Sequence, residues 1–172
     1  MLVQPLDFFN IKVIYLLLSK FWSMKYFIFL SILPVIFLNA QNKTLTLSQC
    51  DELIRQNPND TSNYYERALL NFDLGEFSNA VKDLDVVVLA NPKNITALYK
   101  RSLAKAEIRD ISGAILDLNT LISYDSNNSN YFLKRSVLNA VHGNTNLACQ
   151  DARRASSLGS VDASSIISML CK

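Results

Sequence analysis

The sequence predicts an all-α fold, a solenoid of three helix–turn–helix units with a further helix at each end. Residue types recur every 34 positions between Thr61 and Asp162. A period of that length holds two helices of three to four turns joined by short turns. Glycine and proline stand where such helices would have to end.

Residues 24–40 have the features of a secretory signal peptide: a basic start, a short apolar run and a small residue before the cleavage point. The apolar run at 26–38 is 13 residues long, whereas a helix needs about 20 to cross a bilayer. A cleaved signal therefore fits better than a permanent span. Residues 1–23 then lie upstream of a true start at Met24. If translation starts at Met1, the alternative is an uncleaved arm that anchors the protein in a membrane.

Removal of the first 40 residues also changes the charge. The formal net charge of +2 includes three lysines and one aspartate of this segment, so the mature chain has as many acidic as basic side chains. A neutral surface does not attract phosphate backbones, so nucleic acid is not an expected partner. We expect an exported protein, periplasmic or secreted, that meets a membrane only if the N-terminal segment stays uncleaved.

Residues 41–60 are expected to supply an N-terminal capping helix, from Leu45 to Asn57. Thr46 or Ser48 is its candidate N-cap, and its apolar residues fall on one face. Such a helix is needed because an end unit of a solenoid otherwise leaves its apolar face in water.

The three repeats are predicted to occupy 61–162, in blocks 61–94, 95–128 and 129–162. Six columns agree between the blocks, and small residues in two of them would let paired helices approach closely. These columns are Tyr64, Leu98 and Phe132 at position 4; Arg67, Arg101 and Arg135 at 7; Ala68, Ser102 and Ser136 at 8; Ala80, Ala114 and Ala148 at 20; Asp83, Asp117 and Asp151 at 23; and Leu84, Leu118 and Ala152 at 24.

The ends of the helices are marked as well. Gly75 and Gly143 stand where the first helix of a unit ends, and glycine adopts the left-handed conformation of such an end at low cost. Arg109 takes this place in the second block. Pro58 and Pro92 follow second helices, which a residue without an N–H ends rather than interrupts.

Residues 163–172 are expected to form a C-terminal capping helix. Its apolar residues Ile166, Ile167, Met169 and Leu170 are available to cover the last repeat. This helix would protect the other exposed end of the solenoid.

In these columns the sequence resembles the tetratricopeptide-repeat (TPR) family, whose pattern has a large apolar residue, a small residue four positions later, alanine near position 20 and proline near 32. The resemblance covers residues 61–162 and implies a right-handed TPR solenoid. It also implies a protein or peptide partner in the concave groove lined by the first helices; the alternative is that several groove residues only pack between helices. The groove residues implied are Tyr65, Leu69, Phe72, Tyr99, Leu103, Leu133 and Val137.

TPR domains that dock cytosolic chaperones clamp a terminal carboxylate with basic and amide side chains. The matching positions of the first block hold Tyr65 and Leu69, and Lys100 and Lys134 lie one position off the groove column. Binding of chaperone tails is therefore not expected.

The repeated arginine and aspartate columns could form a ligand clamp, but their strict phase with the core columns favours a structural role. We expect Arg67, Arg101 and Arg135 to lie where helices of neighbouring units meet. Each would pair with an aspartate of the repeat or with a helix-end carbonyl. The expected ion-pair partners are Asp83, Asp117 and Asp151.

Export to an oxidising compartment would favour a disulfide between Cys149 and Cys171. The end of the chain also resembles the closing segment of small bacterial envelope TPR proteins. The alternative is three reduced thiols, including Cys50.

A catalytic site is not expected. The one histidine, His142, falls in a predicted turn, and neither a phosphate-binding glycine loop nor a metal-ligand spacing is present in the sequence. The sequence therefore predicts no enzyme, no cofactor and no metal, but a protein-protein interaction scaffold of the cell envelope. The alternative is a structural subunit of a membrane-associated envelope assembly.

Overall fold

The computed structural model describes residues 45–171, so the N-terminal extension and the signal peptide expected from the sequence lie outside the described residues. Within this range the chain forms eight α-helices and no strand. The helices are α2 (Leu47–Gln56), α3 (Thr61–Asp73), α4 (Phe77–Ala90), α5 (Ile95–Glu107), α6 (Ile111–Tyr124), α7 (Ser129–Val141), α8 (Thr145–Ser157) and α9 (Ala163–Leu170).

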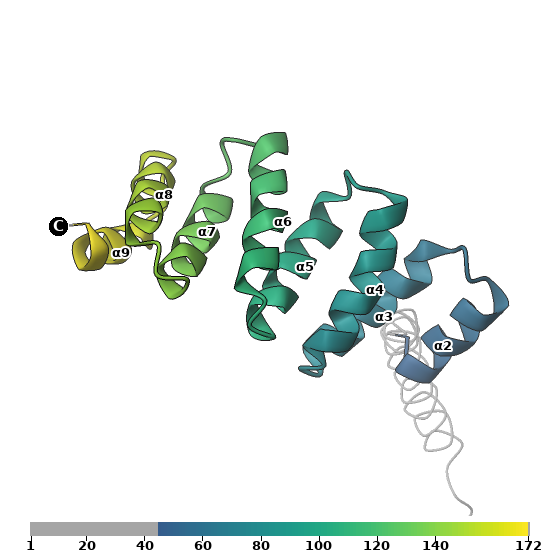
Figure 1. Cartoon of the computed structure of the whole chain (residues 1–172). Coiled ribbons are helices and arrows are strands. Elements are labelled where there is room, and N and C mark those ends of the chain that lie inside the picture. The colour runs from purple at the N-terminus through teal and green to yellow at the C-terminus, as the bar shows by residue number, and fades with distance from the viewer. Residues whose placement is uncertain (1–44, 172) are drawn as a thin grey trace, which may run out of the picture. The chain divides into compact units, whose positions relative to one another are not determined.

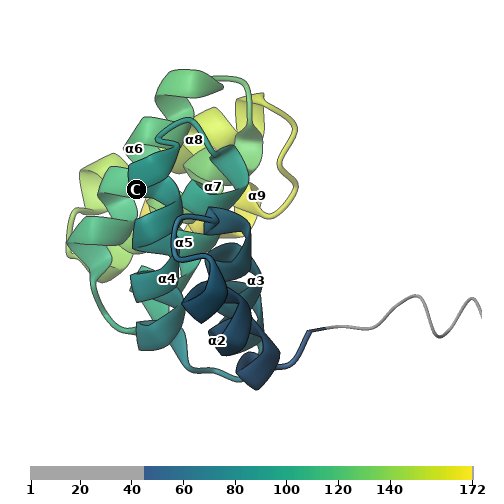
Figure 2. The same cartoon turned by 90° about the vertical axis from the view of Figure 1, so that its right-hand side faces the viewer.

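Each helix packs against its neighbours in the chain, so the helices stack in sequence order (Figure 1). We call the pairs α3–α4, α5–α6 and α7–α8 units 1, 2 and 3. Seen from the α2 end, the later units lie behind α2 and α3 (Figure 2). The predicted all-α solenoid of paired helices is confirmed.

Local sequence explains where the first helices begin. Asp60, Asn94 and Asn128 are N-caps of α3, α5 and α7, spaced one period apart. Each side chain accepts a hydrogen bond from a backbone N–H in the first turn, such as the 3.0 Å bond from the Ala97 N–H to Oδ1 of Asn94. The cap column therefore sets the phase of all three units.

The same helices end in a left-handed residue. Gly75 and Gly143 have φ of 77° and 87°, and Arg109 has φ of 65°. Arginine at this position has a Cβ and pays a steric cost that glycine does not. Among the units of the described stack, unit 2 is thus the one in which the turn between the two helices is strained.

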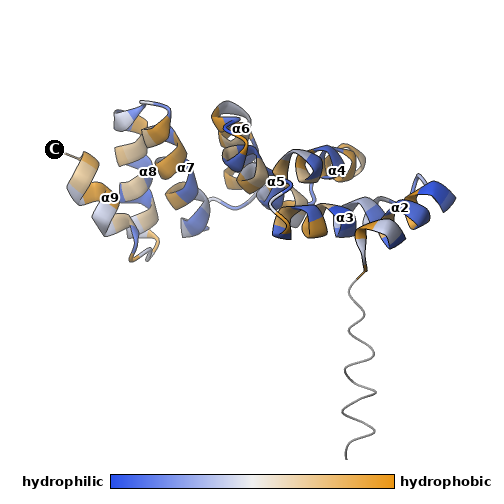
Figure 3. Cartoon of the chain, turned by 90° about the horizontal axis from the view of Figure 1, so that it is seen from below, coloured by the Kyte–Doolittle hydropathy of each residue, from blue (hydrophilic) through white to orange (hydrophobic). Residues whose placement is uncertain are grey.

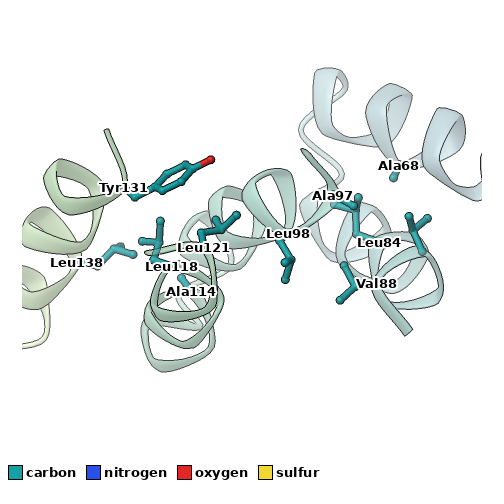
Figure 4. Close-up of a cluster of buried hydrophobic side chains, with 11 residues drawn as sticks. Ala68, Leu84, Val88, Ala97, Leu98, Ala114, Leu118, Leu121, Tyr131 and Leu138 are labelled. Carbon is teal, nitrogen blue, oxygen red and sulfur yellow. The ribbon is translucent and has the colours of Figure 1, made fainter. Parts of the chain in front are cut away.

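Small residues hold the paired helices together. Ala68 and Ala80 in unit 1 are 1% and 0% exposed, and Ala114 is also fully buried. Around them, buried leucines and valines of α4, α5, α6 and α7 form a continuous core, in which Leu118 and Leu121 of α6 lie beside Tyr131 of α7 (Figure 4). Figure 3 shows the result on the ribbon: α3, α5 and α7 each carry hydrophobic and hydrophilic segments.

The end helices are halves of further units. One period separates α2 from α4 and α9 from α7, so α2 corresponds to a second helix and α9 to a first helix. Cys50 of α2 is fully buried in the column of Leu84. Thr46, one of the two predicted caps, caps α2 through a capping box.

One expectation for the closing helix is wrong. Met169 does not cover the last repeat, because Met169 is 72% exposed. It stands one period after Arg135, in the column whose side chains form their two-pronged contact with the second helix of their own unit rather than with the preceding repeat. Ala163, by contrast, is buried against Phe132 and Ala155.

None of the helices between residues 45 and 171 has the length and apolar character needed to span a bilayer.

Candidate interaction surface

Each repeat arginine forms a two-pronged ion pair with the aspartate of its own unit. In unit 2, Nε and Nη2 of Arg101 donate to the two carboxylate oxygens of Asp117 at 2.9 and 2.6 Å. The pairs Arg67–Asp83 and Arg135–Asp151 have the same geometry, with distances from 2.6 to 2.9 Å. Each pair ties the first helix of a unit to the second.

The remaining guanidinium nitrogen reaches the preceding helix. Nη1 of Arg101 donates to Asp85 of unit 1 at 2.8 Å. The equivalent partners are Asp51 for Arg67 at 2.7 Å and Asn119 for Arg135 at 2.6 Å. One arginine therefore joins three helices, and the fork formed by its Nε and Nη2 is occupied by the aspartate of its own unit.

A third column completes the network. Asn71 and Asn139 donate to the aspartates of units 1 and 3 at 3.3 and 3.1 Å. In unit 2 this place is taken by Lys105, whose Nζ lies 3.0 Å from Asp117. Among the described residues, no buried side-chain nitrogen or oxygen lacks a hydrogen-bond partner. The hydrogen bond to Asp83 is the main cause that raises the pKa of Arg67.

A cavity of about 340 Å³ lies between α2 and unit 1 and is lined in part by this network. It includes none of the predicted groove residues. Its lining residues are Leu47, Asp51, Arg67, Asn71, Asn79, Lys82 and Asp83.

The predicted groove residues lie on the first helices of the three units. Side chains of neighbouring first helices contact one another, so the surface is continuous: the Lys100 Nζ lies 4.8 Å from the ring centre of Phe72, and the Asn130 amide donates to the Tyr99 hydroxyl at 2.8 Å. We call the following set the first-helix surface: Tyr65, Leu69, Phe72, Tyr99, Leu103, Leu133 and Val137.

These side chains are shared between core and solvent. Tyr65 and Tyr99 pack in part against the buried core, and Tyr99 contacts Tyr131 with ring centres 5.7 Å apart. Val137 is 44% exposed and Val141 is 57% exposed. The surface thus exposes apolar and aromatic area on all three first helices.

The two C-terminal cysteines are joined. Cys149 of α8 and Cys171, which follows α9, form a disulfide with an S–S distance of 2.02 Å. The bond links two residues that are 22 positions apart in the sequence. Cys50 is a free, buried thiol. Burial raises the pKa of Cys50, and the charge of Glu66 raises it further.

His142 is the C-cap of α7 and is exposed in the turn before α8. In the part of the chain that the structure describes, no group of three or more metal-binding side chains comes together.

Solved structures of TPR proteins are similar to this chain. A crystal structure of MamA is 17% identical, with a TM-score of 0.68, over 72% of this chain and 74% of that one. The first TPR of Spaghetti (RPAP3), bound to the HSP90 peptide SRMEEVD, is 16% identical, with a TM-score of 0.59, over 64% and 90%. The second TPR domain of human RPAP3, in complex with the HSP70 peptide SGPTIEEVD, is 23% identical, with a TM-score of 0.58, over 63% and 92%.

No protein-family model and no curated protein matches the sequence. The likeness to solved structures gives the fold, and the predicted TPR solenoid is confirmed at that level.

Proposed function

We propose that this TPR solenoid is a non-catalytic scaffold of the cell envelope that holds a peptide or protein partner on its first-helix surface. The supporting observation is the set of partly exposed apolar side chains that α3, α5 and α7 each contribute, such as Phe72, Leu103 and Val137. Apolar area that is fixed on rigid helices binds a partner at low entropic cost.

The two RPAP3 domains support this role, because each is described with a bound peptide. Those peptides end in acidic residues. In this chain the corresponding positions of unit 1 hold Tyr65 and Leu69, which cannot clamp a carboxylate by charge. The proposed partner is therefore a different kind of peptide, held mainly by apolar contacts.

The proposed location rests on two features of the chain. Residues 24–40 have the pattern of a signal peptide. The Cys149–Cys171 disulfide fits an oxidising compartment such as the periplasm.

Site-specific photo-crosslinking in the native host tests the partner site. A benzoylphenylalanine at Val137 should crosslink to a partner, because this residue is 44% exposed on the first-helix surface. The matched control is Leu116, an aliphatic residue of α6 that is 63% exposed outside that surface. Equal crosslinking from both positions, or none from Val137, would contradict the proposal.

The mass of the protein recovered from its host tests the location. A mass that begins at Gln41 and rises by about two protons on reduction is expected for an exported protein with one disulfide. A mass that retains the N-terminal segment, together with stoichiometric membrane partners, would instead favour the structural subunit of an envelope assembly.

A further inference from the structure

The charges beside the first-helix surface change sign along the stack. On α3, Glu66 and Asp73 are exposed and acidic. On α5, Lys100 and Glu107 balance each other. On α7, Lys134 is exposed and basic, and hydrophobic Val141 stands where α3 and α5 have an acid.

These charges share the face that carries the apolar surface. Within each block they occupy positions 6 and 13, which are seven residues apart and therefore lie two helical turns apart on one face. The contact between the Lys100 Nζ and the ring of Phe72 places one of them directly against the apolar side chains.

The repeat arginines do not cancel this gradient. Arg67, Arg101 and Arg135 each bind a carboxylate of their own unit. Lys105 is also paired, with Asp117. The unpaired charge beside the surface is therefore acidic in unit 1, balanced in unit 2 and basic in unit 3.

The two ends of the surface are far enough apart to act separately. Helices are about 10 Å in diameter, so α3 and α7, with α5 between them, are separated by about 20 Å. Charges are screened beyond about 8 Å at physiological ionic strength. A segment of twelve extended residues reaches about 40 Å and can contact both ends.

Given the proposed function, on which this step rests, we infer that the partner is an apolar peptide segment with a cationic end and an anionic end. The cationic end lies over Glu66 and Asp73 of α3, and the anionic end lies over Lys134 of α7. The apolar residues supply most of the affinity, and the charge gradient fixes the direction in which the segment lies.

A random library of twelve-residue peptides, selected on the full chain, tests this inference. Peptides that also bind a Val137→Asp variant are discarded, because that variant places a charge in the apolar surface. The enriched peptides should carry basic residues toward one end and acidic residues toward the other.

Binding of the best peptide is then measured by fluorescence anisotropy. The Glu66→Gln/Asp73→Asn variant should weaken binding about fivefold and Lys134→Gln about twofold, the size expected for exposed charge pairs. Asp162→Asn is the matched control, because Asp162 is exposed on the α9 side and caps no N–H with its side chain. It should leave binding unchanged.

Direction is read from a spin label on the peptide. A label at the cationic end should broaden the amide signals of α3 more than those of α7, and a label at the anionic end should do the reverse. Peptides that bind without segregated charges, or equally well to the Gln/Asn variants, would overturn the inference and leave the proposed function standing. If no peptide prefers the full chain over Val137→Asp, the proposed function fails as well.

Discussion

Replacement of Arg101 by methionine tests the structural role of the repeat arginines. Methionine has a similar length but cannot hydrogen bond to Asp117 or Asp85. The substitution removes the bonds of 2.9 and 2.6 Å to Asp117 and the bond of 2.8 Å to Asp85. The carboxylate of Asp117 would stay in place with only 6% of its side chain exposed.

The size of the effect follows from that burial. Loss of one partner of a buried ion pair costs about 3–5 kcal/mol, because a charge is left uncompensated. Lys105 remains 3.0 Å from Asp117, so we expect the low end, about 3 kcal/mol. For a chain of this size that corresponds to a decrease in Tm of about 6–12 °C.

Unit 3 supplies an internal comparison. Asp151 has only the Asn139 amide, at 3.1 Å, in the place of a second cation. Arg135→Met should therefore cost about 1 kcal/mol more than Arg101→Met. In the double variant Arg101→Met/Lys105→Met, Asp117 loses both of its cations. The loss in free energy of unfolding should therefore exceed the sum of the losses in the two single variants.

Thermal unfolding followed by circular dichroism measures all of these variants under one condition. An unchanged Tm in Arg101→Met together with lost partner binding would refute the reasoning and assign the arginine to the ligand site. Equal losses in Arg101→Met and Arg135→Met would show that Lys105 does not compensate Asp117.

Three further predictions concern stability. Asn94→Ala should cost about 1 kcal/mol in urea unfolding because it removes the cap of α5, whereas Asn144→Ala should cost little because Asn144 makes no side-chain cap bond at α8; similar losses would contradict the assignment of the caps. Arg109→Gly should raise stability by about 1 kcal/mol, since it relieves a left-handed residue with a Cβ, and a lower Tm would argue against strain there. Replacement of Cys149 and Cys171 by serine should lower the free energy of unfolding by about 3 kcal/mol, the chain-entropy value for a disulfide between residues 22 positions apart. Amide hydrogen exchange should increase most in α9. An equal increase along the whole chain would contradict the view that the disulfide stabilises α9 locally.

The sequence was sufficient to predict the fold because core, cap and turn residues repeat with one period. A structural role for the Arg67 and Asp83 columns was expected from their phase with the core, with an aspartate of the repeat or a helix-end carbonyl as the arginine's partner. The structure brings arginine and aspartate together in all three units.

The partners that complete the network were missed. The third column contains Asn71, Lys105 and Asn139, which differ in residue type although all contact the same aspartate position. A search for identical residues in the three blocks does not detect this column. A comparison of all positions one period apart would have detected it. Met169 was misplaced for a related reason: its position follows the arginine column, whose side chains are directed mainly to the second helix of their own unit and not to the preceding repeat.

The contact between Asn119 and Arg135 bears on how the chain can change length in evolution or by engineering. A duplicate of 95–128 inserted after residue 128 would present a new copy of Arg101 to Asn119, in the same geometry that Arg135 has now. The duplicate's own Asn119 would then meet Arg135. Whole insertions of 34 residues therefore reproduce the Arg–Asn contact between neighbouring units. They also leave each buried Arg–Asp pair intact, because both residues of a pair lie in the same block.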